Sequence, residues 1–360
     1  MRHVSTSEIY STVAYEDSEN YYGTQIYTTG IKLETKLTSA IIKVTSETPV
    51  ICYSTGFGEY KQSRFSHLLD YIGYNGYDIE EINLKEQTIP ENAVCIVFMG
   101  PKEDMGSTVS ENLKKWLGEG NAAFFFMDVQ DYDSGNMIYN DFTNFRSIFK
   151  EFGLDIEKTK IDESNERKLI NQSGDNIFYA ETLSTGALEN LKNLKVNIKN
   201  TRSIDVTEKK GQYDNFTPAA IIKTSRDAKI ESVENENKSY VSEAVIAASS
   251  EAYTSYSTKV NAMAKIVLFG SSQSFMNAFL EEFGTESARQ IMNESMRWME
   301  LDIKANVADS IEAKQYNNGV KSAVIVTQNE MTAITIVVMI VVPLLIIAAG
   351  FIIWLYRRHM

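Results

Sequence analysis

The sequence predicts an α/β fold built on a parallel sheet, followed by one transmembrane helix near the C-terminus. Helical and strand patterns alternate through residues 50–128 and again through residues 244–299, and the strands are apolar at every position. Such strands are typical of a parallel sheet covered on both faces. Residues 331–356 contain no charged side chain, which is typical of a membrane span.

The N-terminal segment, residues 1–35, is rich in Tyr, Ser and Thr. We expect extended or loop structure there. Apolar residues then recur at helical spacing through residues 34–46, and Pro49 ends the connection. The α/β domain is predicted to extend over residues 36–300.

The first half of this domain predicts strands at 50–53, 77–84, 93–99 and 122–127, with helices between them. Residues 65–72 carry apolar side chains at helical spacing. Thr108 and Glu111 have the spacing of a capping box, which predicts a helix start.

The middle of the domain, about residues 154–238, is polar and less regular, and we interpret it as an insertion or a second subdomain. Strands at 244–248 and 265–269 and two amphipathic helices follow. Residues 301–330 form a polar juxtamembrane segment.

The predicted span, residues 331–356, would reach about 39 Å as a helix and cross a hydrocarbon core of about 30 Å. Trp354 and Tyr356 suit the headgroup layer at its end. Pro343 predicts a kink, and Gly350 after two alanines offers a close helix contact, with lipid exposure as the alternative. A buried core helix is the other interpretation of the whole run, but core helices of this length seldom lack a polar face.

Arg357 and Arg358 begin a short basic tail, residues 357–360, which basic-residue preference places in the cytoplasm. The large domain is then extracytoplasmic, and the protein is a single-pass protein of the cell membrane. The first residues contain no apolar segment that would direct export. Either an N-terminal membrane segment is missing from this sequence, or the chain is tail-anchored with its domain in the cytosol. The arginines favour the first alternative.

Composition excludes one class of partner. The net charge of −13 and the pI near 4.9 argue against nucleic acid, because no basic patch is present to neutralise phosphates. The two cysteines, Cys52 and Cys95, lie in apolar strand-like runs. Small core residues are the favoured interpretation, and a disulfide stays open.

The sequence predicts no catalytic residue, no metal and no cofactor. Its three histidines have no metal-ligand spacing, and no phosphate-binding loop or nucleophile elbow occurs. Both cysteines lie inside strands rather than at strand-to-helix turns, where a nucleophile would be presented.

Two loops are candidates for contact with a ligand or partner. The first contains Thr55, Gly56, Gly58 and Glu59, and the second is residues 270–272, Gly270, Ser271 and Ser272. Each follows an apolar strand and precedes a helix, so both are expected at the carboxyl edge of one parallel sheet, where ligands bind. The alternative for the first loop is a strand-to-helix turn that needs glycine for its backbone geometry.

A third loop, residues 128–135, contains three aspartates. It resembles a calcium loop superficially, but Gly135 falls where a ligand should be and no glutamate follows at the required distance. We interpret it as a solvated acidic loop.

Several blocks of the chain resemble the extracytoplasmic domain of GldG-like proteins, auxiliary components of ABC-type transport systems linked to gliding motility. The blocks, in chain order, are TSAIIKVTSETPVICYSTGFGEY, VCIVFMGPKED, LKKWLGEGNAAFFFMD, KIVLFGSSQSFMNAF, MNESMRWMELDIKAN and PLLIIAAGFIIWLYRRHM. The resemblance extends over most of the chain from about Thr38 to Met360.

The resemblance implies a flavodoxin-like, glutamine-amidotransferase-like α/β fold without known catalytic residues. It also implies spans on both sides of an exported domain. This sequence departs from the family in lacking the N-terminal span and in carrying Phe57 where relatives often have histidine in TGHGE.

We therefore expect a non-enzymatic, membrane-anchored accessory subunit of an ABC-type transport system, with permease and ATPase subunits as partners. A surface-anchored module that binds a saccharide or peptide is the main alternative. An amidotransferase-like hydrolase is a further alternative, which the lack of a nucleophile–base pair disfavours.

Overall fold

The structure, a computed structural model of the 360-residue chain, consists of two compact units. One unit holds Met1–Ile9 and Lys32–Ala313, and the other holds Tyr10–Ile31 and Lys314–Met360. The residues that the structure describes are 10–15, 25–31, 49–74, 77–129, 141–164, 169–171, 177–191, 193–207, 215–233, 238–257, 263–301 and 314–315.

The smaller unit contains a three-stranded antiparallel sheet in the order β1-β2-β18. Its strands are β1 (Tyr10–Tyr15), β2 (Gln25–Ile31) and β18 (Lys314–Gln315). Two of these strands lie in the N-terminal segment for which extended structure is predicted.

The larger unit is built on a ten-stranded sheet, and one half of this sheet is parallel. The order in this half is β17-β6-β5-β3-β4, and every neighbouring pair is parallel. The strands are β3 (Val50–Thr55), β4 (Asp78–Asn83), β5 (Ala93–Met99), β6 (Ala122–Phe126) and β17 (Ala264–Phe269). The α/β class is therefore confirmed.

The other half of the sheet is antiparallel and differs from the parallel sheet that the sequence predicts. It continues from β17 in the order β16-β13-β10-β11, with β9 also beside β10. The strands are β9 (Leu169–Asn171), β10 (Ile177–Thr182), β11 (Lys195–Lys199), β13 (Phe216–Lys223) and β16 (Val245–Ala252). The connection from β16 to β17 contains no crossover helix among its described residues, and parallel neighbours need such a crossover.

Four of these antiparallel strands, β9, β10, β11 and β13, come from the middle segment, residues 154–238. The same segment, together with β15 directly after it, forms two small sheets in the larger unit. One pairs β7 (Leu154–Ile156) with β12 (Ile204–Val206), and the other has the order β15-β14-β8, with β8 (Thr159–Asp162), β14 (Lys229–Ser232) and β15 (Ser239–Val241).

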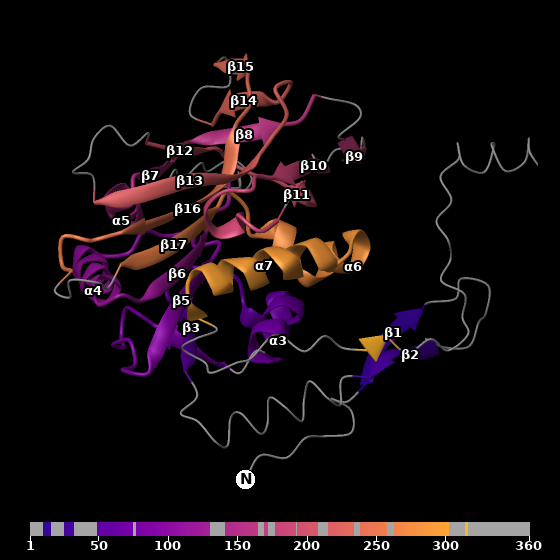
Figure 1. Ribbon diagram of the computed structural model, residues 1–360, viewed down its shortest axis with the longest axis horizontal. Helices are drawn as coiled ribbons and strands as arrows, with labels where there is room; N and C mark the ends of the chain where they lie inside the picture. The colour runs from indigo at the N-terminus through magenta and orange to yellow at the C-terminus, as the bar shows by residue number, and fades with distance from the viewer. Residues whose placement is uncertain are drawn as a thin grey trace, which may run out of the picture. The chain divides into compact units, whose positions relative to one another are not determined.

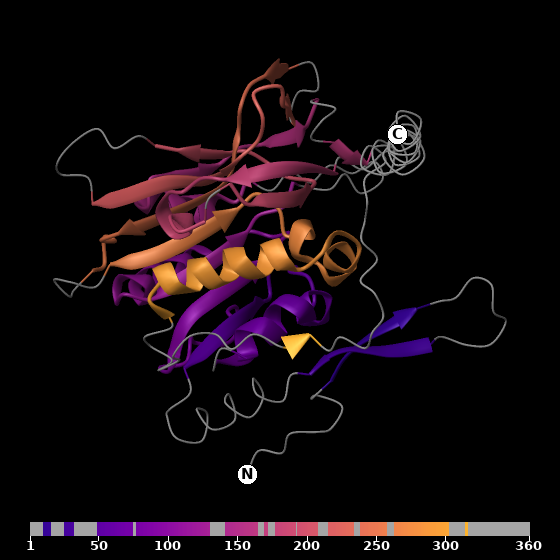
Figure 2. The ribbon, with the colours of Figure 1, turned by 45° about the vertical axis from the view of Figure 1, so that its right-hand side comes forward.

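Helices cover both faces of the ten-stranded sheet (Figure 1). On one face lie α3 (Ser66–Tyr74), α6 (Asn277–Phe283) and α7 (Glu286–Trp298), and Figure 2 shows α7 crossing the sheet. On the other face lie α4 (Ser107–Gly118) and α5 (Thr143–Glu151). Short 3-10 turns are η1 (Gln62–Phe65), η2 (Gly186–Leu188) and η3 (Gln273–Phe275). Both faces are buried, which explains why the inner parallel strands β5, β6 and β17 are apolar at nearly every position, whereas the edge strand β4 is not.

The two cysteines lie on opposite faces of the sheet. Cys95 pairs with Ile51 on the face covered by α3 and α7, whereas Cys52 belongs to the core beneath α4 and α5. Both cysteines are buried, and neither is part of a disulfide. Successive side chains of a strand point to opposite faces, so a disulfide between these cysteines would require a register shift.

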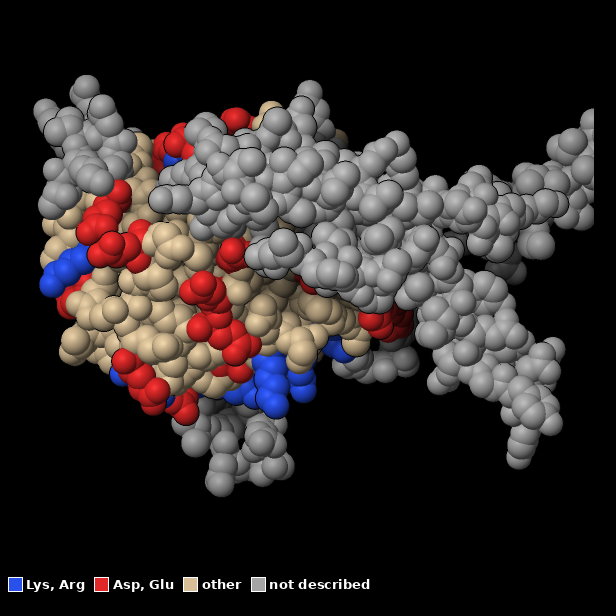
Figure 3. Space-filling model, turned by 90° about the horizontal axis from the view of Figure 1, so that it is seen from below, with Lys and Arg blue, Asp and Glu red and all other residues tan. Residues whose placement is uncertain are grey.

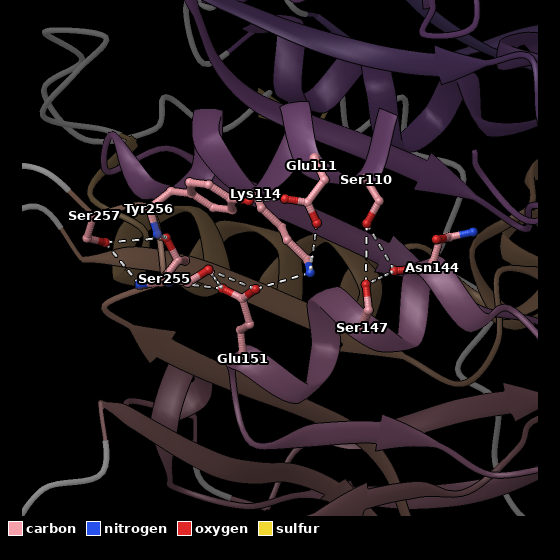
Figure 4. A network of polar contacts seen from close by, with 10 residues as sticks. Ser110, Glu111, Lys114, Asn144, Ser147, Glu151, Ser255, Tyr256 and Ser257 are labelled. Atoms are coloured by element: carbon pink, nitrogen blue, oxygen red, sulfur yellow. Dashed lines mark hydrogen bonds and ion pairs between the residues drawn. The ribbon is translucent and has the colours of Figure 1, made fainter. Parts of the chain in front are cut away.

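The predicted capping box at Thr108 is wrong. Helix α4 begins at Ser107, its N-cap is Gly106, and no side chain caps it. Glu111 instead accepts a hydrogen bond from the hydroxyl of Tyr256 and lies 3.6 Å from Lys114 Nζ (Figure 4). The carboxylate turns away from the helix start because the loop after β16 provides a phenolic donor.

No helix in the described part of the chain is long and apolar enough to cross a membrane. The predicted span and basic tail, including Pro343, Gly350, Trp354, Tyr356, Arg357 and Arg358, lie outside the described residues. The helix expected at residues 34–46 also lies outside them.

Candidate functional site

The two candidate loops lie at one edge of the sheet, as predicted. Strands β3, β5, β6 and β17 are mutually parallel, so their carboxyl ends meet at this edge, which we call the carboxyl edge. Strands β6 and β5 lie between β17 and β3. Three strand spacings of about 4.8 Å therefore put the loops roughly 14 Å apart, and a single small ligand would not touch both directly.

The loop after β3 is closed by its own glutamate. Glu59 Oε1 accepts a hydrogen bond from Ser54 Oγ at 2.8 Å, and Oε2 accepts one from the Phe57 N–H at 2.7 Å. The carboxylate therefore holds the turn. Thr55 donates to the carbonyl of Ile82 at 3.1 Å and ties the loop to β4.

Glycine is required at both predicted positions of this loop. Gly56 has φ of 110° and Gly58 has φ of 74°, a region that disfavours side chains. A Cβ at Gly56 would lie 2.3 Å from Asn83 Oδ1, and one at Gly58 would lie 3.1 Å from the Cβ of Lys102. The turn alternative thus explains both glycines, while Gly58 itself is exposed.

Phe57 is buried. It stands at the position where GldG-like proteins, which the chain resembles, often carry histidine. Its ring packs edge-on against Phe145 with centroids 6.1 Å apart. Its carbonyl accepts hydrogen bonds from the N–H groups of Lys102 at 2.8 Å and Glu103 at 2.9 Å. Phe57 therefore joins the loop after β3 to the loop after β5 through backbone hydrogen bonds, and its ring packs the β3 loop against α5.

Tyr60, Gly100 and Asp128 connect the two candidate loops across the middle strands. A Cβ at Gly100 would lie 2.7 Å from Asp128 Oδ2 and 2.8 Å from the Tyr60 ring. The backbone can therefore pass between these two side chains because residue 100 has none. The Tyr53 hydroxyl donates to the carbonyl of Tyr60 at 2.6 Å, and burial raises the pKa of Tyr53, so this phenol keeps its proton.

The second candidate loop is held by hydrogen bonds to residues that follow β6 and end β11. Ser272 donates to Asp128 through both its N–H and its hydroxyl, the latter at 2.7 Å. Ser271 donates to the carbonyl of Lys199 at 2.6 Å. Both serines are buried, and a Cβ at Gly270 would lie 2.4 Å from the carbonyl of Arg202.

Arg202 is a buried cation beside this loop. Its guanidinium donates to the carbonyl of Glu157 at 2.8 Å and to that of Asp128 at 3.2 Å. Burial lowers the pKa of Arg202 to about 10, and the charge of Asp128 opposes that effect. The guanidinium clamps three chain segments together with charge-assisted bonds.

Sequence reasoning placed Asp128 in a solvated acidic loop and did not single out Tyr60, Gly100 or Arg202. Their contacts join residues far apart in the chain, and the one local signal was the position of Gly100 and Asp128 directly after apolar strands. Residues 130–140 of the acidic loop lie outside the described residues. Within the described residues no group of His, Cys, Asp and Glu is arranged to hold a metal ion.

The solvent-facing part of the carboxyl edge is polar and charged. Lys102 and Glu103 are exposed, and Glu103 forms an ion pair of 2.9 Å with Lys85. Lys102 Nζ lies 5.2 Å from the centre of the Tyr60 ring. These groups can contact a partner surface, while the groups beneath them hold the loops in place.

No protein-family model matches the chain, and no curated protein matches it. Among solved structures, the mmIFT52 N-terminal domain aligns with a TM-score of 0.49 and 13% identity, over 70% of this chain and 97% of that one. The structure of PurLQS from Thermotoga maritima aligns with a TM-score of 0.34 and 11% identity, over 70% of this chain and 99% of that one.

Proposed function

We propose that this chain is a non-enzymatic, membrane-anchored accessory subunit of an ABC-type transport system. Its α/β domain, of the flavodoxin-like type, lies outside the cytoplasm and contacts partner subunits through the carboxyl edge. The span of residues 331–356 anchors it beside the permease, and the basic tail faces the cytoplasm.

The observation that carries this proposal is where the resembling blocks fall in the fold. Four of the blocks shared with GldG-like proteins contain β3, β5, β6 and β17, each with the loop at its carboxyl end. These four blocks therefore fall on the parallel half of the sheet and on its carboxyl edge. We infer that partners contact this edge, because open parallel sheets bind their ligands at the carboxyl ends of the strands.

The bonding of the edge supports binding rather than catalysis. Glu59 accepts hydrogen bonds from the Ser54 hydroxyl and the Phe57 N–H, and Asp128 accepts one from the Ser272 hydroxyl. A general base or nucleophile needs a proton or a reacting atom within reach, whereas these groups act on the protein itself. The exposed groups above them, Lys102 and Glu103, suit a charged protein surface.

The surface charge supports the exclusion of nucleic acid as a partner. On the face in Figure 3, acidic side chains are spread over the described surface, and basic ones gather in small groups. Phosphate binding needs a continuous basic surface.

The test is affinity purification of the full chain, expressed with its complete locus, from membranes dissolved in mild detergent. We expect an ABC permease and an ATPase to co-purify. Lys102→Glu should weaken this retention because it reverses an exposed charge at the carboxyl edge. Lys115→Glu is the matched control. Lys115 is also exposed, but it lies in the last turn of α4, at the end of the helix away from the carboxyl edge.

Three results would contradict the proposal. One is recovery of the intact chain without either subunit. Another is equal loss of both subunits in the Lys102 and Lys115 variants. The third is retention of a saccharide or peptide by the chain alone, which would favour an independent binding module.

A further inference from the structure

The small sheet β15-β14-β8 ends in a strand that is exposed at every residue. Ser239, Tyr240 and Val241 of β15 are all exposed, with Tyr240 at 55% and Val241 at 65%. Figures 1 and 2 show β15 as the outermost strand at one end of the larger unit. An uncovered edge strand offers unpaired N–H and C=O groups to another strand.

The register shows which groups of β15 point outward. The Ser242 N–H donates to the carbonyl of Ala228, and the Ser232 N–H donates to the carbonyl of Lys238. Hydrogen-bonded pairs alternate along an antiparallel ladder, and this register has no bulge, so Tyr240 and Ile230 form the next bonded pair. The backbone groups of Ser239 and Val241 therefore point away from β14.

Two other edges in the larger unit, those of β4 and β8, are protected. Strand β4, at one end of the ten-stranded sheet, exposes Glu80 and Glu81, which repel a second copy. The far side of β8 is occupied by residues 201–203, since the Ile161 N–H donates to the carbonyl of Thr201. Strand β15 is short, but it carries no charge and no proline to block pairing.

We propose that β15 pairs antiparallel with β15 of a second copy of this chain, about a two-fold axis that passes between the two Tyr240 residues. Ser239 then faces Val241 of the second copy, and each such pair exchanges both of its N–H···O bonds. Tyr240 faces Tyr240 of the second copy. The three-stranded sheets join into one continuous sheet across the contact, which is isologous.

The side chains fit this pairing on both faces. On one face, Tyr240 is flanked by Ile230 and then Ile161, so pairing gives an unbroken row of apolar and aromatic residues across the seam. Aromatic cross-strand pairs stabilise sheets.

On the other face, charges alternate along the strands, and Lys229 and Glu231 are bonded within each copy. The uncharged Ser239 and Val241 separate these charges from those of the second copy. No like charges meet directly, which argues for a second copy rather than a charged partner.

The contact is small. A strand of this length buries less than the roughly 1,200–2,000 Å² of a standard stable interface, so the pairing is weak in dilute solution. It becomes populated where copies are concentrated, for example on one membrane surface.

The test is disulfide trapping in the full chain carrying Tyr240→Cys. Residue 240 would occupy a non-hydrogen-bonded pair, in which Cα atoms lie about 4.5 Å apart, within the range that a disulfide spans. Cys52 and Cys95 are buried and do not compete. Tyr253→Cys is the matched control, since Tyr253 is also an exposed tyrosine, outside this sheet.

Under mild oxidation we expect a covalent homodimer from the Tyr240 variant and little from the Tyr253 variant. Adding Val241→Pro removes an N–H that points away from β14, so the hydrogen bonds between β14 and β15 stay intact. The change removes one hydrogen bond from each copy across the contact. We therefore expect disulfide trapping to slow about ten-fold. Circular dichroism checks that this variant stays folded. Equal trapping of both tyrosine variants, trapping of Tyr240→Cys to a different protein, or unchanged trapping with folded Val241→Pro would each overturn the proposal.

Discussion

Replacing Glu59 with alanine tests whether this carboxylate holds the β3 loop or serves a ligand. The change leaves the Ser54 hydroxyl and the Phe57 N–H without their acceptor, and both residues are buried. Each orphaned buried donor costs about 1–3 kcal/mol. Glu59 is half-buried, so water replaces part of the loss. We expect the free energy of unfolding to fall by about 2–3 kcal/mol.

Urea unfolding of wild type and variant measures this loss as a shift in midpoint at unchanged slope. Glu103→Gln is the control, because it breaks an exposed ion pair with Lys85 and should cost less than about 1 kcal/mol. Glu59→Gln keeps one acceptor oxygen, so its loss of unfolding free energy should lie between those of Glu59→Ala and Glu103→Gln. An alanine variant that unfolds at the wild-type midpoint would refute the assignment of Glu59 to loop closure.

Three further predictions concern the thiols, acid stability and topology. Burial raises the pKa of Cys52 to about 12, so this thiol should resist alkylation at pH 8 until the chain unfolds. The intact mass should show that Cys52 and Cys95 are both reduced, because they lie on opposite faces of the sheet. A disulfide between them would contradict that assignment. The hydrogen bond from Tyr256 lowers the pKa of Glu111, so the stabilisation by this bond is present at neutral pH and is lost as the pH falls through the lowered pKa. Tyr256→Phe should therefore weaken the loss of stability in acid. If the unfolding midpoint of this variant depends on pH as in wild type, the assignment of this role to the bond is wrong. Protease added to intact cells that express the complete locus should remove the large domain and leave a C-terminal stub, whereas full protection until lysis would reverse the proposed orientation.

The parallel half of the fold was readable from local pattern. Strands β5, β6 and β17 are apolar at nearly every position because helices cover both faces, and burial on two faces leaves that mark on the sequence itself. Loops that follow such strands must share one edge, so Gly58 and Ser271 could be assigned to the carboxyl edge before any coordinates. The turn in the β3 loop could also be predicted from its two glycines, because glycine readily adopts the positive φ that such a turn needs.

Tertiary structure decided which strands pair and what the polar residues of the edge do. Strand β13 exposes some positions and buries others, and nothing in that pattern identifies β16 as its antiparallel neighbour. The bond between Ser272 and Asp128 joins residues 144 positions apart. Periodicity encodes which face of an element is buried, because that depends on each residue's own backbone geometry. Pairing and hydrogen-bond partners depend on chain segments that meet only in the folded protein, so the alternation of a single strand carries no record of them.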